Sequence, residues 1–386
     1  MPNDFTSVIP KLLAQGLMAL REVSIMPKLV NREYETIAGQ RGSTIDVPIP
    51  SAVVVSDVTP AATAPTTADQ SPTSVPITLD KWKEAPFYMT DKDLLEVVNG
   101  TLPMCASAAI KAIANQVDAD IFALYKGVYG YTGTAGTTPF GGSTPTTSDA
   151  IQLRKVLTDQ LAPNNDRRII LDTSAEANAL GLRALQDASA RGSSQTITEG
   201  TIGRALGFDW YASQNVPTHT ASAAAAATVT MISKSAVGAK SVTLKVSTST
   251  AAIKKGDIIT FAGHSQTYAV GADATLDSTG VAVTISPGLK VAVDGSGTAV
   301  NVTFKASHVV NLGFHRDAFA FASRPLAGDE LSRSLGLGNF QSAVDPVSGL
   351  VLRLEITREH KRLRFSYDIL YGCALVRPEL ASRLAG

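Results

Sequence analysis

The feature that most constrains the fold is a long arm from Thr44 to Met89, in which two strand-like runs flank a tip rich in proline, threonine and alanine. The runs cover residues 44–55 and 74–79. An isolated two-stranded ribbon is marginally stable in water, because it cannot bury its own apolar face. Nothing else in the first hundred residues is large enough to cover it. The simplest interpretation is cover by another copy of the chain; a hairpin packed on its own domain and a proline-rich linker stay open as alternatives.

If the arm lies over a neighbouring copy, its side chains should divide between the two faces of a ribbon, one of which touches the neighbour. The apolar candidates are Ile45, Val47, Ile49, Val53, Val55, Ile77 and Leu79. The acidic candidates for contacts across that interface are Asp46, Asp57 and Asp80, and their expected partners are Arg353, Arg362 and Arg364. Partly desolvated charge pairs of this kind set register more than affinity.

The composition is that of a folded protein with no strong electrostatic preference for a partner. A chain of 386 residues is long enough for two or three cores, and 18% of its residues are charged. Lys plus Arg equals Asp plus Glu at 34 each, which argues against a general nucleic-acid binder. Cys105 and Cys373 predict reduced thiols instead of a disulfide framework. No signal peptide or membrane-spanning run is predicted.

The first half of the chain alternates helix-like and strand-like patterns. Leucines at helical spacing predict a short amphipathic helix over residues 10–23, and an apolar stripe predicts a longer helix over residues 101–126. Glycines between residues 127 and 136 predict a mobile surface loop. A helix over 149–160 and a strand over 168–172 follow. The next helix is expected to open at Thr173, with Glu176 completing a capping box.

The composition changes to Ala, Ser, Thr, Val and Gly between about residues 220 and 308. Short alternating runs separated by glycine-containing turns predict a small all-β barrel or sandwich there. Strand patterns return at residues 309–315, 350–357 and 363–369, so we interpret the β-rich segment as an insertion into an α/β region. Alternation in the two last strands predicts one buried face for each.

No pattern of residues indicates catalysis, a cofactor or a metal site. The sequence around Ser265 lacks the second glycine of a nucleophile elbow and lies in the β-rich insertion, so hairpin residues are the expected reading. Glu359 and His360 lack the second histidine of a zinc protease and should form a turn. Basic residues gather near the C-terminus, where either an inter-subunit salt-bridge surface or a solvated hairpin fits them. They are Arg353, Arg358, Lys361, Arg362 and Arg364.

The order of elements resembles the major capsid protein of tailed bacteriophages with the HK97-type fold, most closely the phage P22 coat-protein family. Five segments carry the resemblance across nearly the whole chain. They are IDVPIP at 45–50, TIGRALGFDWY at 201–211, NLGFHRDAFA at 311–320, YDILYG at 367–372 and RPEL at 377–380.

The resemblance implies an α+β, HK97-type capsid fold with an inserted small all-β domain, and it implies names for the parts. The parts are an N-arm (1–44), an E-loop (45–86), a P-domain (87–147) with a spine helix (101–126), an A-domain in two parts (148–221 and 309–345) around the inserted domain (222–308), and P-domain strands with the C-terminus (346–386). It also implies that the segment from Gly271 to Gly280, with Asp273 and Asp277, is the loop that reaches a neighbouring capsomer.

By the same resemblance, the chain is a structural coat protein that self-assembles as pentamers and hexamers into an icosahedral virion capsid. Its implied partners are a scaffolding protein, a portal, a candidate decoration protein and enclosed double-stranded DNA that is bound without sequence specificity. Assembly is expected in the host cytoplasm. An encapsulin-like compartment is the first alternative, and an α/β enzyme with a β appendage is the second.

Overall fold

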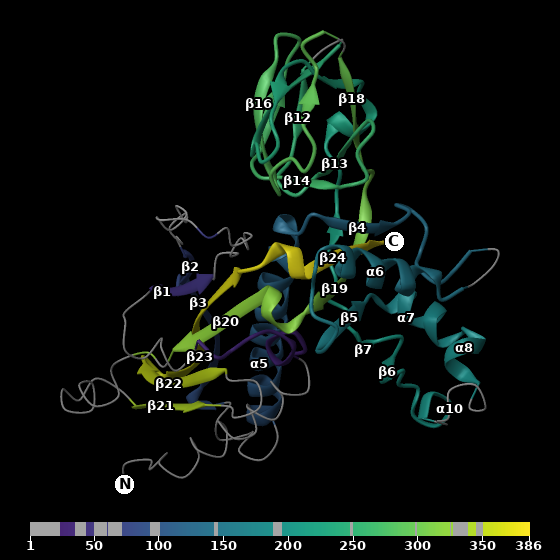
Figure 1. Ribbon diagram of the computed structural model, residues 1–386. Coiled ribbons are helices and arrows are strands. Elements are labelled where there is room, and N and C mark those ends of the chain that lie inside the picture. The colour runs from purple at the N-terminus through teal and green to yellow at the C-terminus, as the bar shows by residue number, and fades with distance from the viewer. Residues whose placement is uncertain are drawn as a thin grey trace. The chain divides into compact units, whose positions relative to one another are not determined.

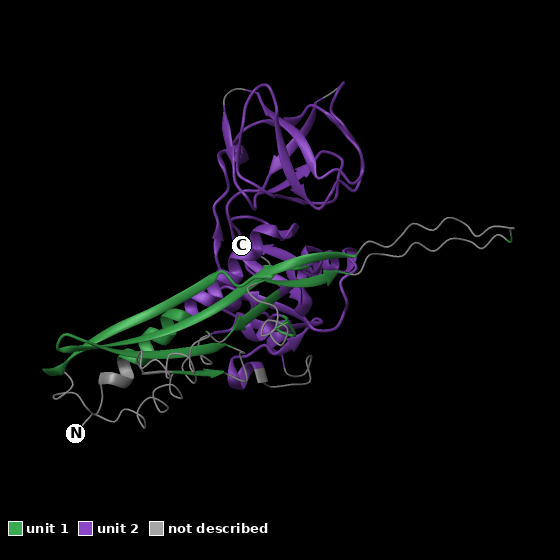
Figure 2. Ribbon diagram, turned by 90° about the vertical axis from the view of Figure 1, so that its left-hand side faces the viewer, with its two compact units in different colours: residues 1–19, 31–113, 320–376 green, residues 20–30, 114–319, 377–386 purple. Residues whose placement is uncertain are grey.

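The structure is a computed structural model, and it describes residues 24–34, 44–49, 60, 72–92, 101–142, 146–187, 195–247, 250–297, 299–324, 326, 339–344 and 350–386. The chain divides into two compact units, which Figure 2 colours green and purple. Unit 1 comprises residues 1–19, 31–113 and 320–376, and unit 2 comprises residues 20–30, 114–319 and 377–386. The helix predicted over residues 10–23 lies outside the described residues.

Unit 1 is built on an antiparallel sheet formed mostly by the C-terminal strands. The strands are β20 (Phe319–Arg324), β23 (Arg362–Leu375), β22 (Val351–Glu359) and β21 (Asn339–Val344) in that order, with β3 (Lys81–Thr90) paired along β23. Phe87 lies opposite Phe365 in the register, and their rings stack with centroids 5.1 Å apart. Figure 1 shows these strands beside one another. The turn predicted at Glu359 and His360 is confirmed, since it joins β22 to β23.

The base of the arm is a short hairpin that packs on its own unit. Strand β1 (Thr44–Ile49) pairs with β2 (Thr73–Thr78), and Ile45 lies opposite Ile77. Buried apolar residues of the hairpin cluster with residues that come more than 200 positions later in the chain. The cluster contains Ile45, Val47, Ile77, Leu79, Ala320, Ala322 and Val376.

This packing corrects the interpretation that a second copy covers the base of the arm. The cover lies outside the first hundred residues, because the covering side chains come from β20 and from the residue that follows β23. The apolar residues also share one face of the hairpin instead of dividing between two, because Asp46 alternates with the buried Ile45 and Val47 and is exposed. Val53, Val55 and Asp57 lie outside the described residues, as does most of the tip.

Unit 2 contains a mixed sheet with helices. The sheet order is β4 (Gly130–Gly133), β24 (Ala381–Ala385), β19 (His308–His315), β5 (Arg167–Leu171), β7 (Phe208–Ala212) and β6 (Arg204–Ala205), and β8 (Thr218–His219) also pairs with β19. The helices are α2 (Met26–Leu29), α6 (Ser148–Asp159), α7 (Thr173–Leu180), α8 (Arg183–Gln186) and α10 (Gln195–Glu199). Short 3-10 turns are η2 (Ala223–Ala226), η3 (Arg316–Ala318) and η4 (Pro378–Leu380). Helix α5 (Thr101–Phe122) continues into the 3-10 helix η1 (Ala123–Gly127), which agrees with the long helix that the sequence predicted.

Two local expectations in unit 2 were wrong. The glycine-rich segment is not only a surface loop, because Gly130–Gly133 forms β4, parallel to β24. At Gly133 φ is +86°, and a Cβ atom there would lie 2.6 Å from the carbonyl oxygen of Ala385, so glycine is required for this close pairing. Helix α7 is capped by Asp172 instead of Thr173, since the Asp172 carboxylate accepts hydrogen bonds from two backbone N–H groups of the first turn.

Residues 229–304 contain a closed barrel, where the sequence pattern left a barrel or a sandwich open. The barrel order is β11 (Ser241–Val246), β16 (Val281–Ser286), β14 (Tyr268–Val270), β13 (Ile258–Phe261), β18 (Val300–Phe304) and β9 (Val229–Met231). Two smaller ribbons join β12 (Ala251–Ile253) to β15 (Ala274–Leu276) and β10 (Lys234–Ser235) to β17 (Val293–Asp294). Alternate strand residues such as Val242, Leu244 and Val246 point into one apolar core.

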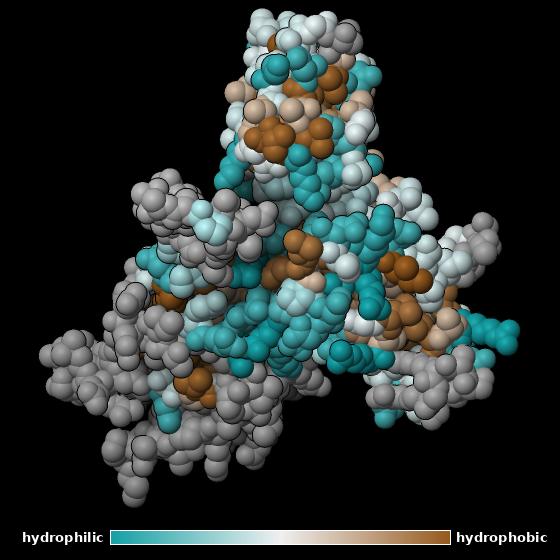
Figure 3. All heavy atoms as spheres, in the orientation of Figure 1, coloured by the Kyte–Doolittle hydropathy of each residue, from teal (hydrophilic) through white to brown (hydrophobic). Residues whose placement is uncertain are grey.

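No helix among the described residues combines the length and the apolar character needed to cross a bilayer. Figure 3 shows apolar residues in small separate spots among hydrophilic ones on the viewed face of the barrel. Val237 and Val291 are the large apolar side chains that the barrel exposes within its described part. Scattered exposed apolar residues of this kind are usual on protein surfaces.

The base of the arm should behave as core. Ile45→Ala removes a fully buried side chain and should lower the free energy of unfolding of unit 1 by about 2–5 kcal/mol. Asp46→Ala, at the exposed position beside it, is the matched control and should change stability by less than about 0.5 kcal/mol. Chemical denaturation of both variants measures the difference. Equal stability of the two variants would show that the hairpin does not need its own unit as a cover.

Candidate functional site

The predicted basic residues lie on the β22–β23 hairpin of unit 1, and the structure gives them acidic partners within the same chain. The Arg353 Nε atom donates to Asp368 Oδ1 at 2.9 Å, and a second bond joins the same two side chains. The Nη2 atom of Arg353 also lies 3.9 Å from Oε2 of Glu355. The side chains of Arg353 and Asp368 are 15% and 5% exposed, so this bidentate pair is partly desolvated and geometrically well defined.

The other basic residues of the hairpin are also engaged locally. Arg364 donates to both carboxylate oxygens of Glu84, at 3.0 and 2.9 Å. Arg358 pairs with Asp91 at 3.2 Å, and Arg362 pairs with Glu359 while lying over the ring of Tyr88. Lys361 forms the turn with φ +57°, where its carbonyl oxygen accepts a hydrogen bond from the Asp91 backbone.

Sequence reasoning found these basic residues and missed their partners. Glu355, Glu359 and Asp368 are close in sequence, and their alternation with arginine was a readable signal. Glu84 and Asp91 come from β3 and its end, which pair with β23 only in the folded sheet. Asp46 and Asp80 are exposed. The roles of all these residues as contacts between subunits stay predictions.

The two aspartates predicted in the loop at residues 271–280 both make local hydrogen bonds in the barrel. The Asp273 carboxylate accepts from the Lys255 backbone N–H at 2.6 Å. The Asp277 carboxylate accepts from the backbone N–H groups of Thr279 and Gly280, which fixes the turn before β16. The segment is only partly a loop, because it includes β15. Its contact with a neighbouring capsomer stays a prediction.

The residues of the rejected nucleophile-elbow pattern lie in the connection between the antiparallel strands β13 and β14, which confirms the hairpin interpretation. They line a cleft of about 440 Å³ together with residues of α6, including Lys155 and Asp159. The Tyr268 hydroxyl lies 3.3 Å from Nδ1 of His264. Among the described residues no group of three His, Cys, Asp or Glu side chains is arranged to hold a metal ion.

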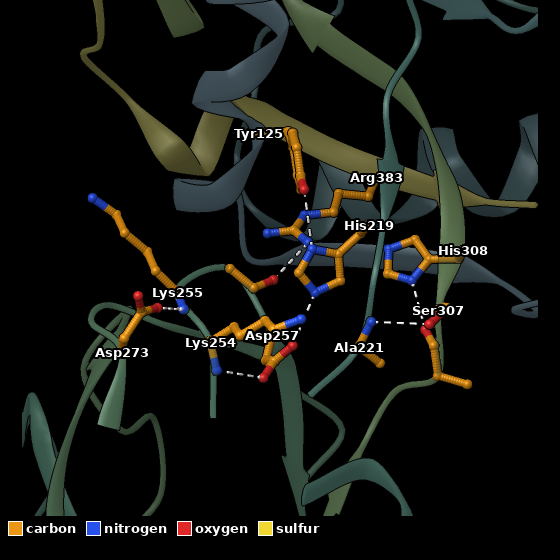
Figure 4. Close-up of polar contacts among 12 residues, drawn as sticks. Tyr125, His219, Ala221, Lys254, Lys255, Asp257, Asp273, Ser307, His308 and Arg383 are labelled. Carbon is orange, nitrogen blue, oxygen red and sulfur yellow. Dashed lines mark hydrogen bonds and ion pairs between the residues drawn. The ribbon is translucent and has the colours of Figure 1, made fainter. Parts of the chain in front are cut away.

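A buried polar network in unit 2 is the most organised group of ionisable side chains that the structure describes. We call Tyr125, His219, Asp257, His308 and Arg383 the barrel-base cluster. The Tyr125 hydroxyl lies 3.0 Å from His219 Nδ1, and His219 Nε2 lies 2.9 Å from Asp257 Oδ1. Figure 4 shows these three side chains in a chain of contacts, with Arg383 beside them. All five side chains are buried.

Each member of the barrel-base cluster comes from a different part of unit 2. Tyr125 lies on η1, His219 on β8 and His308 at the start of β19, directly opposite His219 in the register. Asp257 ends the turn before β13, where its second carboxylate oxygen accepts from the Lys254 backbone N–H at 2.9 Å. The cluster therefore joins the beginning and end of the barrel segment to the sheet.

Arg383 anchors the cluster from β24. Its Nε atom donates to the Val128 carbonyl oxygen at 2.9 Å, and Nη1 donates to the Gly256 carbonyl oxygen at 2.8 Å. Its guanidinium carbon lies 5.0 Å from the centre of the Tyr125 ring. A fully buried guanidinium is costly, and burial lowers the pKa of Arg383 to about 10. The Arg383 side chain thus donates hydrogen bonds to one carbonyl oxygen in a barrel turn and to another directly after η1.

The electrostatics of the cluster follow from burial and from its hydrogen bonds. Burial alone would raise the pKa of Asp257, but hydrogen bonds from His219 and the Lys254 backbone help to hold that pKa below its usual value. Burial is also the main cause that lowers the pKa of His308 to about 4, so this imidazole is neutral at pH 7.

The order Tyr125, His219, Asp257 looks like a proton relay, yet the geometry suits a structural role. His219 and Asp257 are almost fully enclosed, and neither lines the cleft formed by α6 and the β13–β14 connection. The sequence alone did not reveal this cluster, because its members lie far apart along the chain. The signal that could have found it is their position, since one histidine lies near each end of the predicted insertion.

Comparison with known proteins identifies the fold. A chain of a Mycobacterium phage Che8 structure is 18% identical, with a TM-score of 0.51 over 93% of this chain and 90% of that chain. A chain of the capsid of the cyanophage P-SCSP1u is 12% identical, with a TM-score of 0.51 over 94% of this chain and 88% of that chain. No protein-family model and no curated protein matches the chain. The chain therefore has a phage-capsid fold along nearly its full length.

The barrel-base cluster should contribute to stability through its charge. Asp257→Asn should lower the free energy of unfolding by about 1–3 kcal/mol at pH 7. The reason is that it removes the charged carboxylate that accepts hydrogen bonds from His219 and from the Lys254 backbone. The pKa of Asp257 is lowered in the folded state, so this contribution is present above the ordinary value of 3.8 and is lost as pH falls below it. Denaturation at pH 7 and pH 3 measures the change. The exposed Asp273→Asn is the control, and an equal effect of both substitutions would contradict the prediction.

His308 should make the fold less stable in acid. Its pKa is about 4 when folded and 6.5 otherwise, so its neutral form supports the fold above pH 6.5 and this support falls as pH drops from 6.5 to 4. His308→Asn keeps a donor for the Ala306 carbonyl oxygen and removes the titration. The variant should lose less stability than the parent between pH 6.5 and 4.5. Parallel pH profiles of the two proteins would show that His308 does not titrate in this range.

Proposed function

We propose that the chain is the major capsid protein of a tailed phage, which assembles through pentamers and hexamers into an icosahedral shell around double-stranded DNA. The observation that carries the proposal is the fold shared with a cyanophage capsid chain over 94% of this chain and 88% of that one. Because the similarity covers most of both chains, it favours a common overall architecture and not a single domain that two unrelated proteins share. The neutral charge balance fits a container, because strong phosphate binding needs a basic surface.

Within this proposal the structural parts take the roles that the sequence suggested. The arm from residue 45 to residue 86 is the E-loop, α5 with η1 forms the spine helix, and β22 and β23 are the C-terminal strands of the P-domain. Strands β5, β7 and β19 of the unit 2 sheet belong to the A-domain, and residues 222–308 are an inserted domain. The closest family would be that of the phage P22 coat protein, on the basis of the five sequence segments named above.

The proposed partners are other copies of the chain, a scaffolding protein, a portal and a decoration protein. Closed point-group symmetry lets identical copies satisfy the same interfaces, so no second coat protein is needed. The basic hairpin of β22 and β23 would take part as a balanced ionic surface, because its arginines already have acidic partners in their own chain. Such a surface favours register between copies over tight binding.

The chain should form closed shells when it is produced with the scaffolding protein of its own phage. Sedimentation and electron microscopy of the purified material measure particle formation. Shells that hold double-stranded DNA and a portal support the proposal, whereas shells that hold enzyme cargo identify an encapsulin-like compartment instead. A protein that stays monomeric with its scaffold would contradict the assembly role.

The tip of the arm should matter for assembly and little for folding. Deletion of residues 58–73 leaves the buried hairpin residues Ile45, Val47 and Ile77 in place, so the thermal melting temperature should stay close to that of the parent. Particle yield should fall strongly. A Gly/Ser segment of equal length in place of residues 58–73 is the control for chain length. An unchanged particle yield in the deletion would show that the tip is not an assembly element.

A further inference from the structure

The short segment from Ser24 to Val30 connects the first 23 residues of the chain to the rest and lies in a buried seat of unit 2. Met26, Leu29 and Val30 are buried, and α2 makes up most of the segment. A four-residue helix is too short to be stable by itself, so its conformation depends on these tertiary contacts. The contacts that hold the segment therefore decide whether it stays in place.

Asp118 of α5 holds the beginning of this segment. Its side chain is fully buried, and its two carboxylate oxygens each accept one backbone hydrogen bond from a position more than 90 residues away. The Ile25 N–H donates to Oδ2 at 3.1 Å, and the Met26 N–H donates to Oδ1 at 3.2 Å. These two amides start the α2 turn and have no carbonyl partner in a preceding turn. Asp118 thus supplies the hydrogen-bond acceptors that these two N–H groups lack within the segment.

Arg168 of β5 holds the other end, because its Nη1 atom donates to the Leu29 carbonyl oxygen. Other polar groups face Asp118 from two directions. Lys28 of α2 attracts the carboxylate, and Asn215, which follows β7, donates a side-chain hydrogen bond to it. On α5 itself, Asp120 accepts from the Gln116 amide. Asp118 is therefore the ionisable group that contacts the amides at the start of the segment.

Burial and these favourable contacts act on Asp118 in opposite directions. Loss of hydration is the largest effect and raises the pKa of Asp118 from 3.8 to about 6, although the two amides, Asn215 and Lys28 all favour the charged form. The carboxylate is therefore ionised at pH 7 at a net cost to the seated conformation. Release of the segment would uncover the two oxygens that its amides contact and let water reach the carboxyl, which would return its pKa toward the ordinary value.

We propose that Asp118 is a proton-dependent latch for residues 24–30, which seats the segment firmly when the carboxyl is protonated and lets it leave more readily when the carboxyl is ionised. The sign follows from linkage: the seated state binds the proton more tightly than the released state, so acid favours seating. The gain in stability of the seated segment is complete below pH 3.8 and is lost as pH rises through about 6. The difference between these two values corresponds to a change of roughly 100-fold in the seating equilibrium.

The latch is a property of the single chain and does not depend on the proposed function. Its consequence is control over how firmly residues 24–30 stay packed on unit 2. That packing would be weakest at neutral pH and strongest in mild acid. This trend opposes the effect expected of His308, which makes the whole fold less stable as pH falls. A local measurement can therefore separate the latch from global unfolding.

Amide hydrogen exchange followed by mass spectrometry tests the latch. Exchange in the peptide that covers residues 24–31 is measured at pH 5 and pH 8 and corrected for the intrinsic pH dependence of exchange. The parent protein should show protection that is at least 10-fold greater at pH 5 than at pH 8. Asp118→Asn, which cannot ionise, should show the same protection at both values. The control Asp120→Asn, on the same helix, should keep the pH dependence of the parent.

A second variant keeps the test decisive if Asp118→Asn does not fold, which peptides from the barrel would reveal. Arg168→Gln weakens the other end of the segment and leaves Asp118 in place. It should lower protection of residues 24–31 at both pH values and keep the 10-fold difference between them. Protection that does not depend on pH in the parent, or that rises toward pH 8, would overturn the proposal. So would an Asp118→Asn protein that keeps the pH dependence of the parent.

Discussion

The attachment of the barrel to the sheet of unit 2 depends on the buried guanidinium of Arg383. A buried charge is tolerated only when its hydrogen bonds and counter-charges are in place, so the groups around it must keep fixed positions. The Gly256 carbonyl oxygen comes from the barrel and the Val128 carbonyl oxygen from the end of η1. The hydrogen bond between His219 of β8 and Asp257 of the barrel is a second link between the barrel and the sheet. One arginine of the last strand thereby ties together segments more than 100 residues apart.

Buried ionisable groups in unit 2 differ in the sign of their effect because burial and hydrogen bonding compete. At Asp257 the hydrogen bonds prevail and the pKa falls, whereas at Asp118 burial prevails and the pKa rises. Burial also governs His308, whose pKa falls because its charged form is the cation. Acid therefore weakens the barrel base and strengthens the seat of residues 24–30. A chain with both features responds to pH locally and not as one body.

The arm and the basic hairpin both show why neighbouring residues in the sequence were insufficient guides to contacts. The apolar face of the arm base was read correctly as needing a cover, but the cover comes from Ala320, Ala322 and Val376 of the same chain. The sequence left the arginines near the C-terminus either as an inter-subunit surface or as a solvated hairpin, and it did not indicate that Glu84 and Asp91 reach two of them through the pairing of β3 with β23. In both cases the partner lies more than 200 residues away.

The sequence by itself determined the local elements. Apolar periodicity placed the α5 helix and the barrel strands, because side-chain spacing follows directly from helix and strand geometry. It did not determine the role of Gly130–Gly133 as a strand, the Asp172 cap or the barrel-base cluster. Only the tertiary structure decided these, since each depends on a carbonyl, amide or side chain that another segment brings within hydrogen-bond distance. The burial that shifts the pKa of Asp118 and His308 likewise exists only after those segments have packed.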